Sequence, residues 1–287
     1  MKRVLISIAT ILILALVFYV YIIYTLENIP AYFTAEKSNS PKAEGVRDES
    51  IAHSEALTSL PQAAAQVAAV NNPSQNAAIQ NQPLEMWRIV ERENSYNNEL
   101  QYYNSRNVSF EGERIIIRTK EEEMGDKNYT SGMIISKNTY LYGSFLFDIQ
   151  ISEGKGLFPA IWLLPEEDKP LPEVDIFEMV GSEPANFYCV VHYGTRSRPK
   201  KEYFCQQVPV KEEYQVGLIW KPDLLEWYID GELVFQSDKG VPDEPMNLII
   251  NQAVGGNWPG DPDDETQFPA EFIIKSVDIK PLPGASQ

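Results

Sequence analysis

The segment EVDIFE, residues 173–178, places three carboxylates in a run of residues that otherwise favour a β-strand. Side chains alternate between the two faces of a strand, so Glu173 and Asp175 point to one face and Glu178 to the other. An unpaired carboxylate turned into an apolar interior is energetically costly. A β-bulge inserts one extra residue and shifts this alternation by one. The segment therefore predicts a bulged strand with all three acids on one surface.

The chain after Trp87 alternates short β-rich runs with turn signals, and no window there has the pattern of a long amphipathic helix. The Asp-Gly pair in YIDGELVF (228–235) predicts a two-residue β-hairpin. Many short strands at such spacing predict an all-β domain, an antiparallel sandwich or barrel. The expected strands are 114–120, 143–151, 186–194, 213–220, 224–230, 246–256 and 271–279.

The N-terminal part of the chain predicts a membrane anchor and a tether. Residues 4–24 carry no charge, and a helix of that length crosses the roughly 30 Å apolar core of a bilayer. Lys2 and Arg3 would hold residues 1–3 in the cytoplasm, so the remainder would be periplasmic or extracellular. Residues 25–85 have the low-complexity composition of a tether, and residues 86–287 form the expected folded domain. The alternative is a signal peptide cleaved near residues 31–35 and a secreted product.

The charge of the chain excludes one class of partner. Its 287 residues include 41 acidic and 24 basic ones, a formal net charge of −17. A surface that negative repels phosphate backbones, so we expect no nucleic-acid partner. We expect residues 86–287 to form a monomer, and residues 4–24 to bring a membrane as a partner.

The only two cysteines, Cys189 and Cys205, flank the turn-like stretch GTRSRPKKEY (194–203). If the chain beyond residue 24 is periplasmic or extracellular, both cysteines lie in an oxidising compartment, where a cross-strand disulfide can form. Two buried thiols are the equal alternative. Neither the number nor the spacing of the cysteines supports a zinc site.

Three carboxylates on one face repel one another, and this repulsion raises the pKa of at least one of them. A protonated acid beside an ionised one is what retaining glycoside hydrolysis requires, with roughly 5–5.5 Å between the two carboxyl groups. Taken alone, the six residues are also compatible with a solvated acidic strand face or a calcium site. A Ser-His-Asp or Cys-His hydrolase would have to rest on His192, since His53 lies in the tether, and no nucleophile elbow accompanies it.

The blocks around this segment resemble glycoside hydrolase family 16, in particular its laminarinase-like endo-β-1,3(4)-glucanase branch. EVDIFE is similar to the E-x-D-x-x-E pattern of that family in its bulged form. Further blocks follow in the order of the family: NNELQYY (97–103), YTSGMIISK (129–137), GLFPAIWLLP (156–165), HYG (192–194) and AVGGNWPGDPDDETQFPAEF (253–272). The resemblance runs from Trp87 to Ile279.

The resemblance implies a role for each acid. Glu173 would be the nucleophile, Glu178 the general acid/base and Asp175 an assisting residue. The family fold implied is a β-jelly roll of the concanavalin A-like kind, with a concave, open substrate groove and endo-action. Residues at sugar-contacting positions of the family are Asn98, Phe158, Trp162, His192 and Trp258.

Two departures from the family pattern affect the expected ligands. Phe158 stands where the family commonly has Trp, which would reshape one sugar platform. Lys275 stands where the family often has an Asp that binds a structural calcium, so a calcium site is disfavoured there. We expect no metal or other cofactor in catalysis.

Together these observations predict a membrane-anchored retaining endo-glycosidase acting on β-1,3- or mixed β-1,3/1,4-glucan. The alternatives are a transglycosylase, a hydrolase of another polysaccharide such as a galactan, and a non-catalytic carbohydrate-binding receptor on the same scaffold. Retention of both Glu173 and Glu178 argues against the receptor.

Overall fold

The computed structural model describes residues 83–94, 96–165 and 169–282, which all belong to one compact unit. The predicted membrane segment (4–24) and tether (25–85) therefore lie outside the described residues, apart from 83–85. None of the helices within the described ranges has the length and apolarity needed to span a bilayer. The division of the chain into anchor, tether and catalytic domain stays a prediction.

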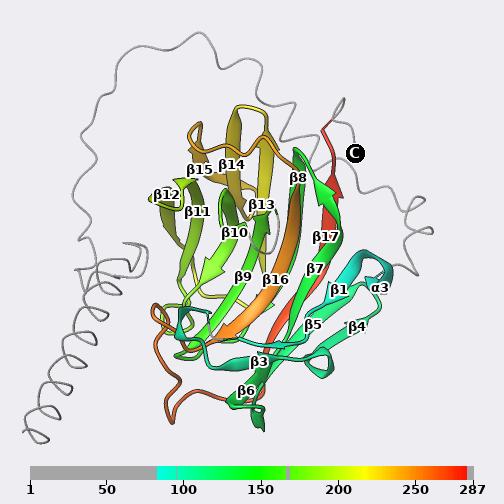
Figure 1. Ribbon diagram of the computed structural model, residues 1–287, viewed down its shortest axis with the longest axis vertical. Helices are drawn as coiled ribbons and strands as arrows, with labels where there is room; N and C mark the ends of the chain where they lie inside the picture. Colours follow the sequence, from blue (N-terminus) through cyan, green and yellow to red (C-terminus); the bar gives the residue numbers. More distant parts are fainter. Residues whose placement is uncertain (1–82, 95, 166–168, 283–287) are drawn as a thin grey trace, which may run out of the picture. The chain divides into compact units, whose positions relative to one another are not determined.

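The described residues form two packed β-sheets (Figure 1). The first sheet has seven strands, all antiparallel to their neighbours. In spatial order they are β1 (Trp87–Ile89), β7 (Met133–Tyr140), β16 (Met246–Val254), β9 (Leu157–Leu164), β10 (Glu173–Met179), β11 (Asn186–Thr195) and β12 (Arg198–Gln207).

The second sheet has ten strands, and its only parallel pair among the described residues is β3 with β6. In spatial order they are β15 (Glu232–Ser237), β14 (Leu224–Ile229), β13 (Tyr214–Lys221), β8 (Gly143–Ile151), β17 (Ala270–Lys280), β5 (Arg114–Met124), β6 (Lys127–Ser131), β3 (Gln101–Tyr103) and β2 (Arg92–Glu93), with β4 (Val108–Glu111) paired to β5. Helical structure in the described residues is limited to α3 (Pro83–Met86) and two short 3-10 turns, Tyr96–Asn98 and Ser105–Asn107.

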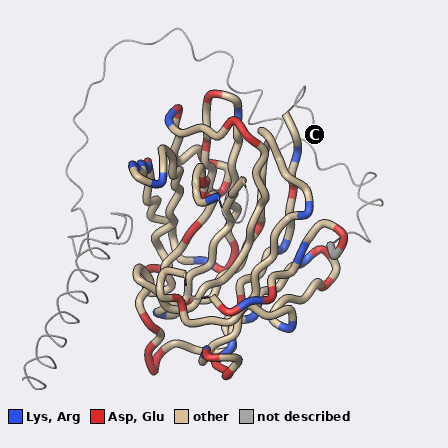
Figure 2. Tube along the Cα trace, viewed as in Figure 1, with Lys and Arg blue, Asp and Glu red and all other residues tan. Residues whose placement is uncertain are grey.

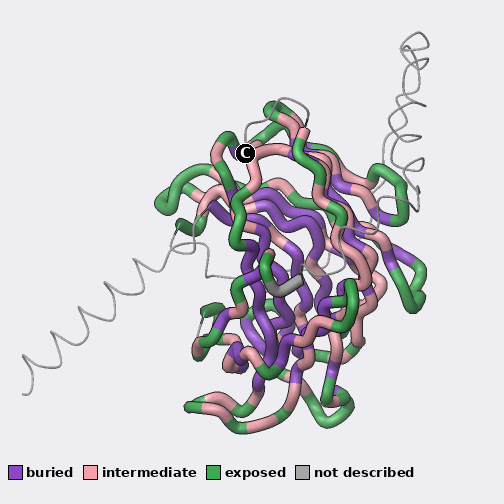
Figure 3. The backbone as a smooth tube through the Cα atoms, turned by 90° about the vertical axis from the view of Figure 1, so that its right-hand side faces the viewer, coloured by how far each residue is buried: buried purple, intermediate pink, exposed green. Residues whose placement is uncertain are grey.

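The core lies between the two sheets, where alternate side chains of both meet in one cluster. Phe177 on β10 packs edge-on against Phe187 on β11 and also contacts Phe272 on β17 of the other sheet. Trp87, Trp220 and Trp227 are buried in this cluster, as expected of tryptophans within apolar strands. Burying each such side chain stabilises the fold by about 1.5–3 kcal/mol. Figure 3 shows the buried strands on the inside and exposed turns around them.

All seven strands expected from the sequence are present, within a few residues of their predicted ends. The predicted hairpin is also confirmed: β14 and β15 are joined by Asp230 and Gly231, with φ of 51° and 82°. Both residues have positive φ, as a type I′ turn requires. The expected all-β sandwich is therefore confirmed, and the choice between sandwich and barrel is settled for the sandwich.

The disulfide alternative for Cys189 and Cys205 is wrong, because both thiols are free. The register of β11 and β12 gives the reason. Cys189 lies opposite Phe204, whereas Cys205 lies opposite Tyr188. The two cysteines are thus one residue out of step, so they point to opposite faces of the sheet. Cys189 is buried in the core, and Cys205 is half-buried on the other side.

Candidate active site

The β10 strand contains the bulge that the sequence predicts. Between Asp175 and Glu178, three steps along β10 correspond to two steps along β11, from Val190 to Tyr188. Between Asp175 and Phe177, two steps correspond to one along β9. One extra residue therefore sits at 176–177. Ile176 and Phe177 are both buried in the core cluster, which turns Glu178 back to the face of Glu173 and Asp175.

The three acids share the face of the sheet that is turned away from the core, called here the outer face. His192 on β11 lies directly opposite Glu173 and joins them. Its Nε2 is 3.3 Å from Asp175 Oδ2 and 3.8 Å from Glu173 Oε1. The Glu173 side chain is 24% exposed to solvent and the Asp175 side chain 4%, so Glu173 is the more accessible of the two.

All three carboxyl groups have raised pKa values. Burial raises the pKa of Glu173 to about 8, with a further contribution from the negative charge of Asp175 and an opposing one from His192. Burial also raises the pKa of Asp175, against the opposing charge of Lys201. The pKa of Glu178 is raised well above its usual range by burial and then by the charges of Asp175 and Glu173. Two acidic neighbours thus add to the effect of burial on the pKa of Glu178, and both favour its protonated form.

Aromatic side chains lie on both neighbours of β10. Trp162 on β9 is opposite Asp175, and its indole donates a hydrogen bond to Asn251 Oδ1 at 2.8 Å. Trp258, which is 49% exposed, makes edge-on contacts with Phe158 (5.3 Å between ring centroids) and Tyr188 (4.8 Å). Tyr188 lies opposite Glu178. Aromatic rings therefore lie near Glu178 and beside Asp175.

Three comparisons with known proteins agree on the family. The family model described as "Glycosyl hydrolases family 16" matches residues 94–271, which is more than half of the chain. The chain belongs to glycoside hydrolase family 16. It is similar to a β-glucanase from Rhodothermus marinus, with 28% identity in an alignment 212 residues long that covers 64% of this chain and 74% of that protein.

Two solved structures of glucanases have a similar fold. The chain is similar to the endo-β-1,3-glucanase from Pyrococcus furiosus, with a TM-score of 0.61 and 28% identity over 69% of this chain and 88% of that one. It is also similar to the laminarinase from Rhodothermus marinus, with a TM-score of 0.63 and 27% identity over 70% and 92%. The part of the chain matched by the family model, residues 94–271, includes β10 and its bulge.

The resemblance to family 16 predicts five sugar-contacting residues. Four of them lie around the acids, and the fifth, Asn98, has a polar partner elsewhere. Phe158, Trp162, His192 and Trp258 lie on the strands and loop around the acids. Asn98 instead donates a hydrogen bond from Nδ2 to Asn257 Oδ1 at 2.7 Å. It has a φ of 59°, so it fixes a left-handed turn against the loop that carries Trp258. A sugar contact of Asn98 stays a prediction.

Glu99 is a fourth acid near this site that sequence reasoning missed. Its Oε2 accepts hydrogen bonds from Asn94 and Gln101. Burial raises the pKa of Glu99 to about 7, partly offset by these hydrogen bonds and by Arg92 and Lys127. The pKa of Tyr96 is raised by burial and then by the charges of Glu173 and Glu99, so Tyr96 lies near both acids. The signal was a lone Glu among amides and tyrosines in NNELQYY (97–103).

Metal-ligating groups also meet at this site. Among the described residues, one ligand atom each from Glu173, Asp175 and His192 lie within 4.8 Å of one another. Two of these residues, Glu173 and Asp175, belong to the three acids of β10, and the third is the histidine opposite Glu173. The calcium position implied by the resemblance to family 16 is a separate place in the chain, at Lys275. Lys275 forms an ion pair with Glu213. A cation held at that position repels a second one.

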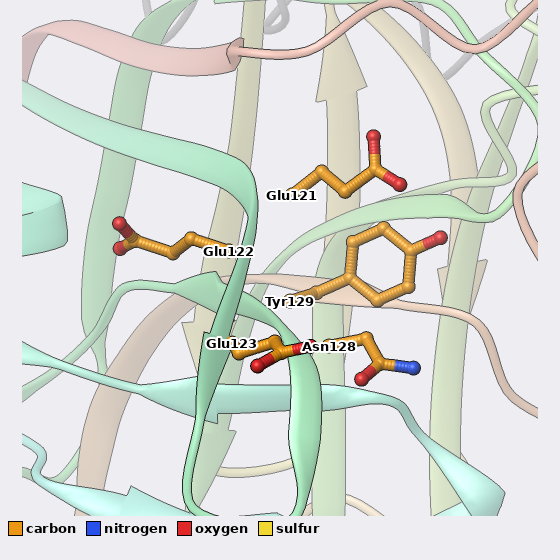
Figure 4. Close-up of a pocket in the computed structure, with 5 residues that line it drawn as sticks. All are labelled: Glu121, Glu122, Glu123, Asn128 and Tyr129. Atoms are coloured by element: carbon orange, nitrogen blue, oxygen red, sulfur yellow. The ribbon is translucent and has the colours of Figure 1, made fainter.

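A separate shallow pocket of about 310 Å³ lies at the β5–β6 hairpin. It is lined by Glu121, Glu122, Glu123, Asn128 and Tyr129. Figure 4 shows Glu121 and Tyr129 pointing to one side of the hairpin and Glu122 to the other. Glu122 accepts a hydrogen bond from Thr130, so one of the three acids is already engaged. None of the β10 acids lines this pocket.

Proposed function

We propose that this chain is a retaining endo-β-glucanase that hydrolyses β-1,3- or mixed β-1,3/1,4-glucan. The observation that carries the proposal is the bulge in β10, which gathers Glu173, Asp175 and Glu178 on one face in a family 16 chain. The relatives reported above are β-glucanases, laminarinases among them, and they support the same substrate class.

In the first step of the proposed reaction, the carboxylate of Glu173 attacks the anomeric carbon. A bond from Glu173 to that carbon forms while the bond to the glycosidic oxygen breaks, and Glu178 gives its proton to the leaving oxygen. In the second step, Glu178 takes a proton from water, which attacks the same carbon and releases Glu173. Only side chains of the protein and water take part.

The pKa order supports this assignment of roles. The acid must hold a proton when the nucleophile does not, and Glu178 has two acidic neighbours against one for Glu173. Asp175, nearly fully buried and beside His192, would assist because its charge raises the pKa of Glu178.

The substrate would lie across the strands on the outer face. Trp162, Phe158 and Trp258 offer ring faces for the C–H side of a pyranose, and Asn98 and His192 offer polar groups for its hydroxyls. We propose that this face is the concave groove of a jelly roll, open at both ends. Such a groove admits the middle of a polymer and gives endo-action.

We also propose the placement of the chain in its cell. Residues 4–24 would form a signal anchor with residues 1–3 in the cytoplasm, and the catalytic domain would be periplasmic or extracellular. The support is the uncharged 21-residue run behind Lys2 and Arg3. Secretion after cleavage is the alternative.

The test is the release of reducing sugar from laminarin and from mixed-linkage glucan by the full-length chain. We expect short products from internal cleavage, and a loss of at least about 1,000-fold in kcat in Glu173→Gln and in Glu178→Gln. Glu153→Gln, which changes an exposed glutamate outside the site, is the matched control and keeps its activity. Full activity in either of the first two variants contradicts the assignment. Longer oligosaccharides among the products would identify a transglycosylase.

A further inference from the structure

The β11–β12 hairpin carries a group of cations that the proposed function does not use. Its members are Arg196, Arg198, Lys200 and Lys201. None of them forms an ion pair with an acid among the described residues, although acids outnumber basic residues by 41 to 24 in the whole chain. Lysines elsewhere are paired, for example Lys155 with Asp263 and Lys239 with Glu202. Figure 2 shows the blue residues gathered at this hairpin.

Strand register divides these cations between the two faces of β12. Lys200 lies opposite Tyr193, whose ring packs against the core cluster, and Lys200 Nζ is 5.9 Å from the centre of that ring. Lys201 lies opposite His192 and thus on the outer face. Its charge also lowers the pKa of Asp175 and of Glu178, which places it near the acids.

Tyr203 shares the outer face with Lys201. It is 53% exposed, and Lys201 Nζ lies 5.1 Å from the centre of its ring. One cross-strand row runs from Trp162 through Asp175 and Val190 to Tyr203. A polymer lying across the strands at the acids would therefore continue onto Tyr203, two strand spacings or roughly 10 Å from β10.

A simpler explanation covers part of this pattern. β12 is the edge of its sheet, and lysines on an edge strand oppose pairing with another chain. That explanation applies to every cation of the hairpin equally. It gives no reason for an exposed tyrosine ring under an ammonium group on the acid-bearing face.

We infer that Tyr203 and Lys201 form an outlying sugar subsite that takes a unit carrying an anionic substituent, a carboxylate or a sulfate. Tyr203 supplies a ring face for the pyranose, and Lys201 supplies a charge-assisted hydrogen bond to the anion. The inference rests on the proposed function, because it extends the same polymer across β11 and β12.

The experiment compares three polymers: laminarin, a carboxymethylated β-1,3-glucan and a sulfated β-1,3-glucan. The full-length chain carrying Glu173→Gln serves for binding measurements, and the parent chain for kcat/KM. We divide the affinity for each charged polymer by the affinity for laminarin, and we expect this ratio to fall about two- to fivefold in Lys201→Gln. We expect the same ratio to be unchanged in the neighbouring control Lys200→Gln. Salt at about 0.5 M should remove the preference, since it screens exposed charges.

Tyr203 gives a second readout. Tyr203→Ala is expected to weaken binding of all three polymers, and Tyr203→Phe to restore it, because the ring face is what contacts the sugar. The ring is half exposed, so neither change disturbs the core.

The outcomes separate the inference from the function on which it rests. An equal fall in Lys200→Gln and Lys201→Gln, or no fall in either, overturns the subsite while cleavage of laminarin upholds the enzyme. Failure of the parent chain to cleave any of the polymers overturns the proposed function, whatever the binding ratios are. A preference for one charged polymer over the other identifies the anion.

Discussion

Glu178 is held in an environment that favours its protonated form, and the cause lies in its immediate neighbours. Burial comes first, followed by the charges of Asp175 and Glu173. The spacing of EVDIFE predicts which side chains share a face, once the bulge is inferred from the cost of burying Glu178. It does not predict His192 or Lys201 as neighbours, because these contacts depend on strand register between segments far apart in the sequence.

The raised pKa of Glu173 makes folding stability depend on pH. A carboxyl whose pKa rises from 4.5 to about 8 on folding binds more protons in the folded state. Its stabilising contribution is complete below about pH 4.5 and is lost as the pH rises through 8. We expect Glu173→Gln to match the parent chain in Tm near pH 5 and to exceed it near pH 9, by several degrees for a gain on the order of 1–3 kcal/mol.

Thermal unfolding of both proteins across this pH range checks the prediction. Glu153→Gln, which removes an exposed carboxylate, should follow the parent curve at every pH. A Tm difference for Glu173→Gln that stays constant with pH would show that Glu173 is not held in a charge-disfavouring site.

At the scale of elements, the bulge in β10 is held by the opposite sheet. Trp227 on β14 donates a hydrogen bond from Nε1 to the backbone carbonyl of Asp175 at 2.9 Å. Trp220 on β13 makes a similar buried bond, to the carbonyl of Pro242 at 3.1 Å, outside the bulge. Both tryptophans lie in apolar stretches of the sequence, which give no sign of this difference.

These two indoles allow a matched test of the bulge. Trp227→Phe and Trp220→Phe should each cost about 1–3 kcal/mol of unfolding free energy, because each leaves a buried carbonyl without its donor. Only Trp227→Phe should also lower kcat, by about 10- to 100-fold, since small displacements of catalytic groups are costly. Denaturant unfolding and kcat on laminarin give the two readouts. An equal loss of kcat in both variants would mean that Trp227 has no special effect on the acids.

The strands themselves were predictable where hydrophobic runs and turn residues mark them. The seven expected strands and the Asp230-Gly231 turn are examples. The relation of Cys189 to Cys205 was not predictable, because a shift of one residue in the β11–β12 register reverses which face a side chain takes. For the same reason, the outer-face position of Tyr188 became clear only from its pairing with Glu178.

Over the whole molecule, the sequence predicts an acidic all-β domain behind an apolar N-terminal segment. The strand pattern alone does not decide between a sandwich and a barrel. It also does not predict the strand order, because β16 enters between β7 and β9 from about 90 residues away. Such long-range pairing leaves no local pattern in the sequence. The predicted anchor at 4–24 lies outside the described residues and remains to be tested on the full chain.

Removal of residues 1–30 tests the anchor. We expect the full-length chain to sediment with membranes and to resist extraction by salt, whereas the shortened chain should be soluble and keep its kcat on laminarin. Replacing Lys2 and Arg3 by Ser in the full chain is the control, because it alters orientation signals and leaves the apolar run intact. A full-length chain found in the soluble fraction at its full mass would contradict an anchor.

The most direct test of the account is chemical rescue of two variants by azide, with an activated aryl β-glucoside oligomer as substrate. In Glu173→Ala, azide can occupy the place of the nucleophile and attack the anomeric carbon once, so the account predicts an α-glycosyl azide. In Glu178→Ala, Glu173 still forms the glycosyl-enzyme and azide attacks in the second step, so a β-glycosyl azide is predicted. Nuclear magnetic resonance of the products distinguishes the two anomers. The reverse pair of anomers, or rescue in neither variant, would contradict the roles given to Glu173 and Glu178.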